Sequence, residues 1–159
     1  MEEVIINEHN KQEYPPAHSA EHILNGTMVK MFGCPRSRIN HVERKKSKCN
    51  YDLPRPLSEE EIRRVEQTVN EVIERDLPIT AEYVTRAQVP EGIDLSRLPE
   101  DASEMLRLVR VGDYDVCLCA GSHVGHTAQI GHFRISSTSF NEGSFRIVFR
   151  LDNPDPSFG

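Results

Sequence analysis

Two short pairs of metal-binding residue types, about a hundred positions apart, most constrain how this chain folds. His18 and His22 are four residues apart, and Cys119 and His123 are separated by the same interval. On a helix, residues four apart share a face, so the two imidazoles of the first pair point the same way. Together the four side chains can form a zinc shell of mixed nitrogen and sulfur ligands. We therefore predict a fold that joins the two ends of the chain around one Zn²⁺ ion.

Length and composition favour one domain. The chain has 159 residues, of which 37% are hydrophobic and 28% charged, as in an ordinary soluble globular domain. We expect a domain over residues 17–151, an N-terminal tail or edge strand over 1–16 and a C-terminal tail over 152–159. The longest apolar run is far too short to span a bilayer.

The N-terminus and the cysteines favour a cytoplasmic location. The acidic start of the chain is not followed by the apolar segment of a secretory signal. The four cysteines fit no disulfide framework; they are Cys34, Cys49, Cys117 and Cys119. In a reducing compartment, a cysteine near a histidine more often binds a metal or takes part in catalysis than forms a crosslink. Cys119 is the predicted ligand, whereas we expect Cys117 to be a small core residue.

Positive charge is concentrated in one short segment of an acidic chain. The net charge is −6, which disfavours binding of nucleic acid by the surface as a whole. Between residues 36 and 48, however, six basic residues accompany one acidic residue. The basic residues are Arg36, Arg38, Arg44, Lys45, Lys46 and Lys48. Such a segment is either a phosphate-binding surface or a solvated loop, and charge alone favours the loop.

Two segments carry helical signals. Two prolines before an apolar stripe and a glycine after it predict a helix over residues 17–32. A capping box from Ser58 to Glu61 opens a second stripe and predicts a helix over 58–75. The first helix carries both histidines of the first pair, and the plain alternative is that both are ordinary surface histidines.

Alternation of apolar and polar residues predicts about five further strands. They are expected at residues 79–85, 105–111, 114–119, 133–138 and 145–151, with a hairpin within 38–51. Short turns between them imply antiparallel neighbours. We therefore predict an α+β two-layer sandwich, with the helices packed on a largely antiparallel sheet. In this fold, the first helix and the strand that delivers Cys119 meet at the metal.

The four predicted ligands allow two kinds of zinc site. Four protein ligands close a tetrahedral shell and make the metal structural, whereas three ligands and a water leave a Lewis-acidic position for hydrolysis. The sequence leaves open whether His123 binds tightly, swings away or acts on a substrate. Gly121 lets the backbone approach a ligand closely. Ser122 and Thr127 place hydroxyl groups nearby, although each alone is more often a turn or capping residue.

The motifs also follow one another in a distinctive order. A helix with H-x-x-x-H is followed by a helix that begins S-x-x-E, and then by a strand that ends in Cys119-Ala-Gly-Ser-His123-Val-Gly-His-Thr127-Ala-Gln-Ile-Gly131. This order resembles the editing domain of alanyl- and threonyl-tRNA synthetases, in which the last motif is C-G-G-T-H-V-x-x-T-x-x-I-G. More closely, it resembles the short, free-standing alanyl-tRNA editing hydrolases. The resemblance extends over about residues 17–151, and the ordered set is far more specific than either ligand pair.

The resemblance implies a hydrolase that removes a wrong amino acid, serine or glycine, from the 3′ end of alanine tRNA. It implies a Zn²⁺ ion that holds the aminoacyl group or polarises a water. The backbone from Gly121 to His123 would supply oxyanion donors, and the basic segment would contact acceptor-stem phosphates. Ala120 and Ser122 stand where the family has glycine and threonine. With Thr127, they are implied to line the substrate pocket.

Two other functions fit the same residues. One is a zinc hydrolase of the same fold that acts on a small ester or amide without tRNA. The other is a non-catalytic, zinc-stabilised RNA-binding module, for which four firm protein ligands would be the signature. The basic segment separates these functions, because neutralising it weakens binding of a tRNA and spares a small substrate.

Overall fold

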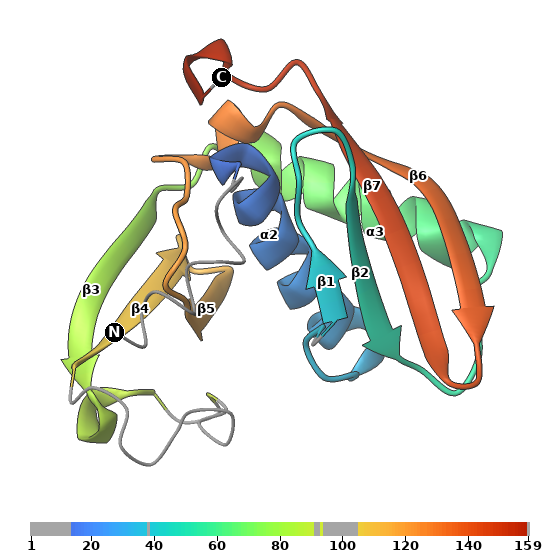
Figure 1. The fold of residues 1–159 in the computed structure, drawn as a ribbon, viewed down its shortest axis with the longest axis horizontal. Helices are drawn as coiled ribbons and strands as arrows, with labels where there is room; N and C mark the ends of the chain where they lie inside the picture. The colour runs from blue at the N-terminus through green and yellow to red at the C-terminus, as the bar shows by residue number, and fades with distance from the viewer. Residues whose placement is uncertain (1–13, 38, 91–92, 94–104, 159) are drawn as a thin grey trace.

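Two helices and seven strands make up the part of the chain that the computed structural model describes, residues 14–37, 39–90, 93 and 105–158 (Figure 1). The helices are α2 (Pro15–Phe32) and α3 (Glu59–Glu74). One sheet has the order β1 (Ile39–His41), β2 (Ser47–Asp52), β7 (Ser144–Asp152) and β6 (His132–Asn141). The other has the order β3 (Ile79–Thr85), β4 (Met105–Val111) and β5 (Asp115–Leu118). All strand pairs are antiparallel, so the predicted α+β class is confirmed, with the strands divided between two sheets.

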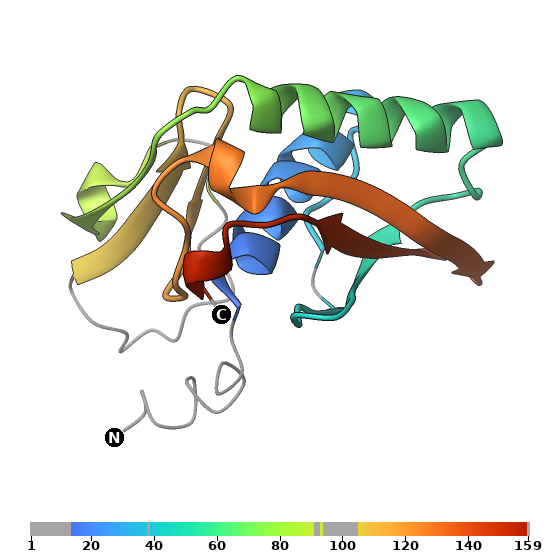
Figure 2. The ribbon, with the colours of Figure 1, turned by 90° about the horizontal axis from the view of Figure 1, so that it is seen from above.

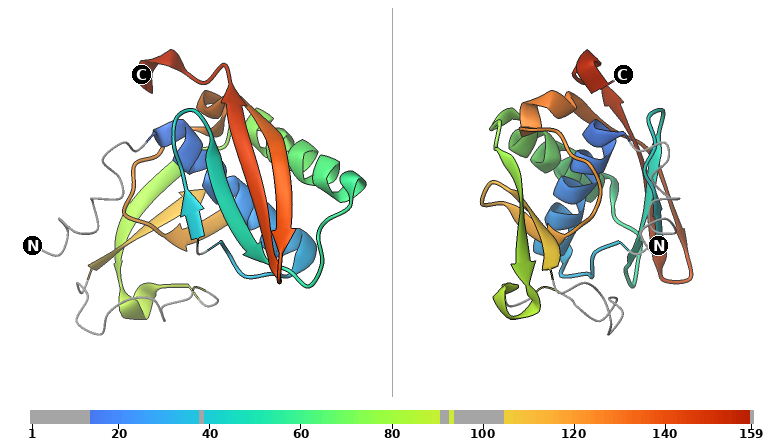
Figure 3. Two further views of the ribbon diagram at one scale, coloured as in Figure 1. Left: turned by 45° about the vertical axis from the view of Figure 1, so that its right-hand side comes forward. Right: turned by 60° about the vertical axis from the view of Figure 1, so that its left-hand side comes forward.

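Helix α2 lies between the two sheets and is the centre of the fold (Figures 2 and 3). It begins at Pro15, two residues before the predicted start, because prolines are tolerated in a first helical turn. Gly33 ends it in the left-handed conformation, with a φ of 68° and its N–H bonded to the Val29 carbonyl. Twelve of its eighteen residues are buried, so polar side chains on its inner faces need partners within the protein.

Helix α3 covers one side of this arrangement and follows the sequence prediction closely. Ser58 accepts a hydrogen bond from the Glu61 N–H, and the Glu61 carboxylate accepts one from the Ser58 N–H. This capping box satisfies two of the helix's unpaired donors. The buried face consists of Val65, Val69, Val72 and Ile73. Asn70 joins the helix to β6, since its amide donates to the Phe133 carbonyl and accepts from the Phe133 N–H.

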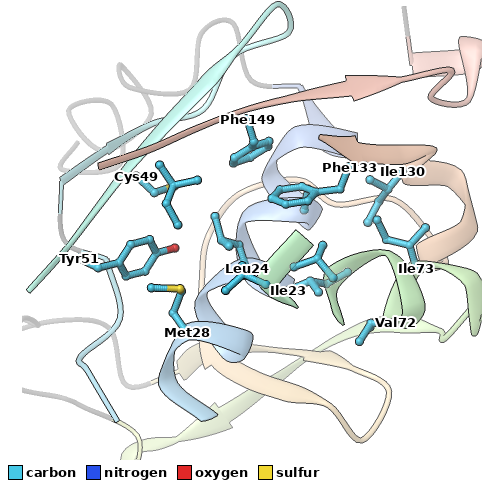
Figure 4. Close-up of a cluster of buried hydrophobic side chains, with 14 of the residues drawn as sticks. Ile23, Leu24, Met28, Cys49, Tyr51, Val72, Ile73, Ile130, Phe133 and Phe149 are labelled. Atoms are coloured by element: carbon cyan, nitrogen blue, oxygen red, sulfur yellow. The ribbon is translucent and has the colours of Figure 1, made fainter. Parts of the chain in front are cut away.

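The hydrophobic core lies between α2, α3 and the four-stranded sheet (Figure 4). Alternate residues of β7 point inward, and Phe145, Ile147 and Phe149 are each at most 1% exposed. The Phe133 ring of β6 packs on Phe149 with centroids 4.9 Å apart. The hairpin expected within residues 38–51 is confirmed as β1 and β2, and the buried side chains of β2 join this core.

The three-stranded sheet has a smaller apolar cluster of its own, formed by Val84, Leu106 and Leu108. The strands predicted at 79–85 and 105–111 are confirmed, and the third strand, β5, ends at Leu118. Cys119 therefore stands one residue beyond the strand, in the loop that leads to η2 (Thr127–Ile130). The other short 3-10 helices are η1 (Arg86–Gln88) and η3 (Pro156–Phe158).

The C-terminal segment, expected to be a tail, contacts the domain. The Asp155 N–H donates to the Gln129 carbonyl at 3.0 Å, and Phe158 contacts the main core. Of the N-terminal segment, residues 1–13 lie outside the described part of the chain, and Tyr14 is buried at the start of α2. Within the described residues, neither helix has the length and apolar character needed to cross a membrane.

Candidate metal centre

The two predicted ligand pairs meet at one end of α2. His18 and His22 lie in the first turns of the helix, and Cys119 and His123 lie in the loop after β5. One ligand atom from each residue lies within 4.8 Å of all the others. The fold therefore brings together the four side chains that sequence spacing predicted.

The spacing of the four groups fits a zinc ion. In a tetrahedral shell with bonds of about 2.0–2.3 Å, neighbouring ligand atoms are about 3.5 Å apart. The Cys119 Sγ lies 3.4 Å from the His18 Nε2 and 3.7 Å from the His123 Nε2. The His18 and His123 rings stack with centroids 4.5 Å apart, and His22 meets His123 edge-on at 4.6 Å. One thiolate and three imidazoles are a donor set that suits Zn²⁺.

The outer nitrogens of two histidines have partners that turn the inner nitrogens toward the centre. The His18 Nδ1 lies 3.2 Å from the Ser122 carbonyl oxygen, to which it donates when it carries the proton. The His22 Nδ1 lies 3.0 Å from the Cys117 Sγ and 3.6 Å from the Asp115 Oδ2. Partners of this kind fix the tautomer and the orientation of a metal-binding histidine. Both rings therefore present Nε2 to the shared centre.

Asp115 is itself held by Arg36. Two guanidinium nitrogens donate to its two carboxylate oxygens at 2.7 and 3.1 Å. Burial would raise the pKa of Asp115, but its contacts with His22 and Arg36 lower it, so the group is a carboxylate at neutral pH. The site also explains a glycine inside α2, since a Cβ at Gly26 would lie 3.0 Å from the Asp115 Oδ1. A chain of contacts thus runs from Arg36 through Asp115 to the outer nitrogen of His22.

The loop that carries Cys119 and His123 is fixed by β4 and by α2. Arg107 on β4 donates to the carbonyls of Cys119 and Gly121 at 3.1 and 2.6 Å. The Val124 N–H donates to the Ser19 hydroxyl of α2 at 3.0 Å. These bonds satisfy backbone groups that a buried loop would otherwise leave unpaired. They also hold the loop ligands at a fixed distance from the helix ligands.

Charge interactions at the centre favour a thiolate. Burial alone would raise the pKa of Cys119, but contacts with the three histidines lower it to about 3. Burial lowers the pKa of His22, but Asp115 and two cysteines raise it well above its usual value. For His123 the effect of burial prevails, and its pKa is lowered. A cysteine that is already a thiolate at neutral pH binds a metal without first losing a proton.

The remaining residues predicted for the catalytic loop divide between the surface and the interior. Ala120 and Ser122 are exposed beside the centre, while Gly121 is buried under the Arg107 side chain. Thr127 lies elsewhere. Its hydroxyl is fully buried, bonds to the carbonyls at the end of α3 and accepts the Leu77 N–H. The assignment of Thr127 to a substrate pocket is therefore corrected: its hydroxyl closes the C-terminal end of α3.

The five basic residues of this segment that the structure describes do not share one environment. Arg44, Lys45 and Lys46 are exposed in the turn between β1 and β2, and Lys48 is half-buried on β2. The Arg44 guanidinium lies 5.0 Å from the ring centroid of Tyr14, the residue that precedes α2, so this turn is near the helix end that carries His18. Arg36 is half-buried and bonded to Asp115, so its role as a phosphate contact stays a prediction. Arg38 lies outside the described residues.

Sequence reasoning missed the partners behind His22. Cys117 is buried, as expected of a small core residue, and its sulfur also lies against the His22 ring. The available signal was the period of two along a strand, which places Asp115, Cys117 and the position of Cys119 on one face. For Arg36 no such signal exists, since its contact with Asp115 spans 79 positions of sequence.

The fold and the site define an α+β protein with a candidate metal centre of three histidines and one cysteine. Residues 106–148 match the family described as the threonyl and alanyl tRNA synthetase second additional domain. This match includes most of β4, all of β5, both loop ligands and most of the β6–β7 hairpin.

Three alanine–tRNA ligases show how far the similarity extends. The chain is 31% identical over 137 residues to the ligase of Leptospira biflexa, a match that covers 82% of this chain and 14% of the ligase. It is 33% identical over 133 residues to that of Methylacidiphilum infernorum, with coverage of 82% and 14%. For Petrotoga mobilis the identity is 27% over 145 residues, with coverage of 89% and 16%. The chain is thus related to the editing domain of alanyl-tRNA synthetases, and it spans about a seventh of the length of these ligases.

Proposed function

We propose that the chain is a zinc-dependent aminoacyl-tRNA deacylase that acts in trans on mischarged tRNA, most readily Ser-tRNA(Ala) or Gly-tRNA(Ala). One observation carries this proposal: four metal-ligating side chains from the two ends of the chain converge at the helix end that lies near an exposed basic turn. A metal beside a phosphate-binding surface suits a substrate with a labile ester at the end of a nucleic acid. The relationship to the synthetase editing domain supports the same reaction.

His18, His22, Cys119 and His123 would hold the zinc. When bound, Zn²⁺ supplies positive charge that can polarise an ester carbonyl or a water. His123 differs from the other two histidines, because among the described residues no group bonds to its Nδ1. A ligand without an outer partner is the one most easily displaced. We infer that His123 is the ligand that gives way to substrate.

The chain's own contribution to the reaction is position and hydrogen bonding. The ester is intrinsically reactive, so holding it against a water beside oxyanion donors would suffice. In this proposal, backbone N–H groups from Gly121 to His123 are the donors, although the Gly121 N–H also donates to the Cys119 sulfur at 3.4 Å. The exposed side chains of Ala120 and Ser122 border the aminoacyl group. Because both side chains are small, the space suits a small amino acid such as serine or glycine.

The basic turn would bind the acceptor end of the tRNA. Arg44, Lys45 and Lys46 are exposed on the same end of α2 as the centre. Exposed cations along one turn neutralise successive phosphates and make binding sensitive to salt. The proposal places this partner, and the reaction, in the cytoplasm.

A deacylation assay tests the proposed function. Ser-tRNA(Ala) is incubated with the wild-type protein and with Cys119→Ala and His22→Ala, using Cys34→Ala and His132→Ala as matched controls. Cys34 lies just beyond the far end of α2, and His132 is exposed on β6. We expect loss of deacylation in the first two variants and normal rates in the controls. Equal rates in all five proteins would refute the proposal.

A non-catalytic, zinc-stabilised RNA-binding module remains the second candidate, because four converging protein ligands can close the zinc shell. The two functions differ in what the zinc-loaded protein does to mischarged tRNA. A structural module binds the RNA but does not deacylate it, and removing the zinc with a chelator unfolds the protein and abolishes RNA binding. In the proposed enzyme, the zinc-loaded protein binds mischarged tRNA and releases the free amino acid.

A further inference from the structure

Glu21 is a buried carboxylate beside the metal centre for which neither the ligand set nor the proposed reaction gives a role. It directly precedes His22 on α2 and is only 7% exposed. A buried carboxylate is costly unless hydrogen bonds or opposite charges compensate it. The groups that contact the Glu21 carboxylate therefore indicate its role.

One carboxylate oxygen is firmly anchored. The Glu21 Oε2 accepts the Asn25 side-chain amide at 2.8 Å and the Asn40 side-chain amide at 2.9 Å. The Tyr51 hydroxyl donates to the Asn25 Oδ1 at 2.7 Å, so the amide group of Asn25 is oriented with its N–H atoms toward Glu21. Two donors on one oxygen fix the direction of the whole carboxylate.

The other oxygen points toward the metal centre. The Glu21 Oε1 lies 3.9 Å from the His18 Nε2, the ring atom that also faces the Cys119 sulfur. In the described part of the chain, no donor makes a hydrogen bond to this oxygen. Glu21 is not among the four residues whose ligand atoms all lie within 4.8 Å of one another. The oxygen therefore stands beside the ligand shell with its acceptor capacity unused.

The second buried carboxylate near the centre cannot serve the same purpose. Both oxygens of Asp115 accept bonds from Arg36, and one of them faces the outer nitrogen of His22. Of these two carboxylates, Glu21 alone can accept a donor from a molecule bound at the centre.

We propose that Glu21 binds the α-ammonium group of the aminoacyl ester, and so selects esters of free amino acids over esters whose amino group is acylated. This inference rests on the proposed function. An aminoacyl ester presents a primary ammonium group two bonds from its carbonyl carbon, and a fixed carboxylate forms a charge-assisted hydrogen bond with such a group. An acylated amino group carries no positive charge, so it would form no charge-assisted hydrogen bond with Glu21. The consequence is that peptidyl esters are spared.

The test compares two ligands and three proteins by calorimetric titration. The ligands are the non-hydrolysable seryl amide of 3′-amino-3′-deoxyadenosine and its N-acetyl derivative. The proteins, all zinc-loaded, are the wild type, Glu21→Gln and Glu60→Gln. The side-chain oxygen of the substituted glutamine can still accept both asparagine amides, so Glu21→Gln removes the charge and keeps the anchoring. Glu60 lies exposed in the first turn of α3 and controls for the same charge change.

We expect the wild type and Glu60→Gln to bind the free-amine ligand roughly 10- to 100-fold more tightly than the N-acetyl ligand. In Glu21→Gln we expect this preference to fall to within about threefold, with unchanged affinity for the N-acetyl ligand and unchanged zinc content. Equal affinity of the wild type for both ligands would overturn the inference, even if the variant does not fold. An equal loss of affinity for both ligands in Glu21→Gln would also overturn it, and would assign Glu21 to the support of His18.

The same proteins separate this inference from the proposed function. If the wild type prefers the free amine but does not hydrolyse Ser-tRNA(Ala), the deacylase proposal fails and the ammonium site stands. If the wild type hydrolyses Ser-tRNA(Ala) and N-acetyl-Ser-tRNA(Ala) at equal rates, the deacylase proposal stands and the ammonium site fails.

Discussion

The two sides of α2 differ in what holds them together. Toward the four-stranded sheet and α3, the helix packs through Ile23, Leu24 and Met28 in a continuous apolar core. Toward the three-stranded sheet, its contacts include polar ones, through His22, which faces Asp115 and Cys117 of β5. The first side gains its stability from apolar burial, whereas the second depends on hydrogen bonds and on the proposed zinc ion. We infer that the fold and the site can be damaged separately.

The largest effect on the polar side should come from Cys119→Ala. Removing the thiolate should lower deacylation of Ser-tRNA(Ala) on the order of 10³-fold, because the metal loses its soft ligand. Hydrogen exchange should show β6, β7 and α3 still protected. Loss of protection in those elements would show that the apolar core depends on the metal centre, and would contradict the inference that the two can be damaged separately.

The matching effect on the apolar side should come from Phe149→Ala. The ring is 1% exposed, so its removal should lower the free energy of unfolding by about 3–5 kcal/mol. Tyr83→Ala, at a position 66% exposed, should change it by no more than about 0.5 kcal/mol. Urea unfolding measures both. The folded fraction of Phe149→Ala should bind one zinc per chain. Loss of zinc from that fraction would show that the metal centre depends on the apolar core.

A smaller effect is expected from the residues behind His22. Asp115→Asn keeps the size of the side chain and removes the charge that orients the ring, so zinc affinity should fall by about 10- to 100-fold. Competition with a chelator of known affinity measures this change. Asp113→Asn, at an exposed neighbouring position, is the control. Unchanged zinc affinity in Asp115→Asn would mean that Cys117 alone sets the orientation of His22.

Much of this arrangement was readable from the sequence. The capping box of α3, the alternation in β7 and the two ligand pairs each depend on neighbours within a few residues, so spacing predicts them directly. The division of the strands into two sheets was not predicted. The pattern of a strand shows which of its faces is buried, but it does not show which element covers that face. The partners of Arg36 and Thr127 were not predicted for a related reason. A charge or a hydroxyl in a loop has many possible partners, and the fold selects one.

A modest effect should follow from neutralising the basic turn. Replacing Arg44, Lys45 and Lys46 with glutamine should weaken binding of tRNA(Ala) and reduce the slope of log affinity against log salt, by about 0.7–0.9 for each phosphate that is no longer neutralised. Affinity for the seryl-adenosine amide should not change. A salt slope equal to that of the wild type would exclude this turn from the tRNA interface.

The smallest effect concerns acid stability of the apolar side. The Arg55 side chain and the Ser58 N–H lower the pKa of Glu61 from its usual 4.5 to about 2. A lowered pKa stabilises the fold above pH 4.5, and this contribution is lost as the pH falls toward 2. The Tm difference between wild type and Glu61→Gln should therefore be present at pH 7 and shrink as the pH falls through this window. A difference that does not change with pH would contradict a role for the Glu61 charge.

X-ray absorption at the zinc edge of the metal-loaded protein tests the central claim most directly. The structure predicts one zinc per chain with one sulfur ligand at about 2.3 Å and nitrogen ligands at about 2.0–2.1 Å. The sulfur signal should vanish in Cys119→Ala and persist in Cys117→Ala. A protein that binds no zinc, or a zinc with two sulfur ligands in the wild type, would contradict the account.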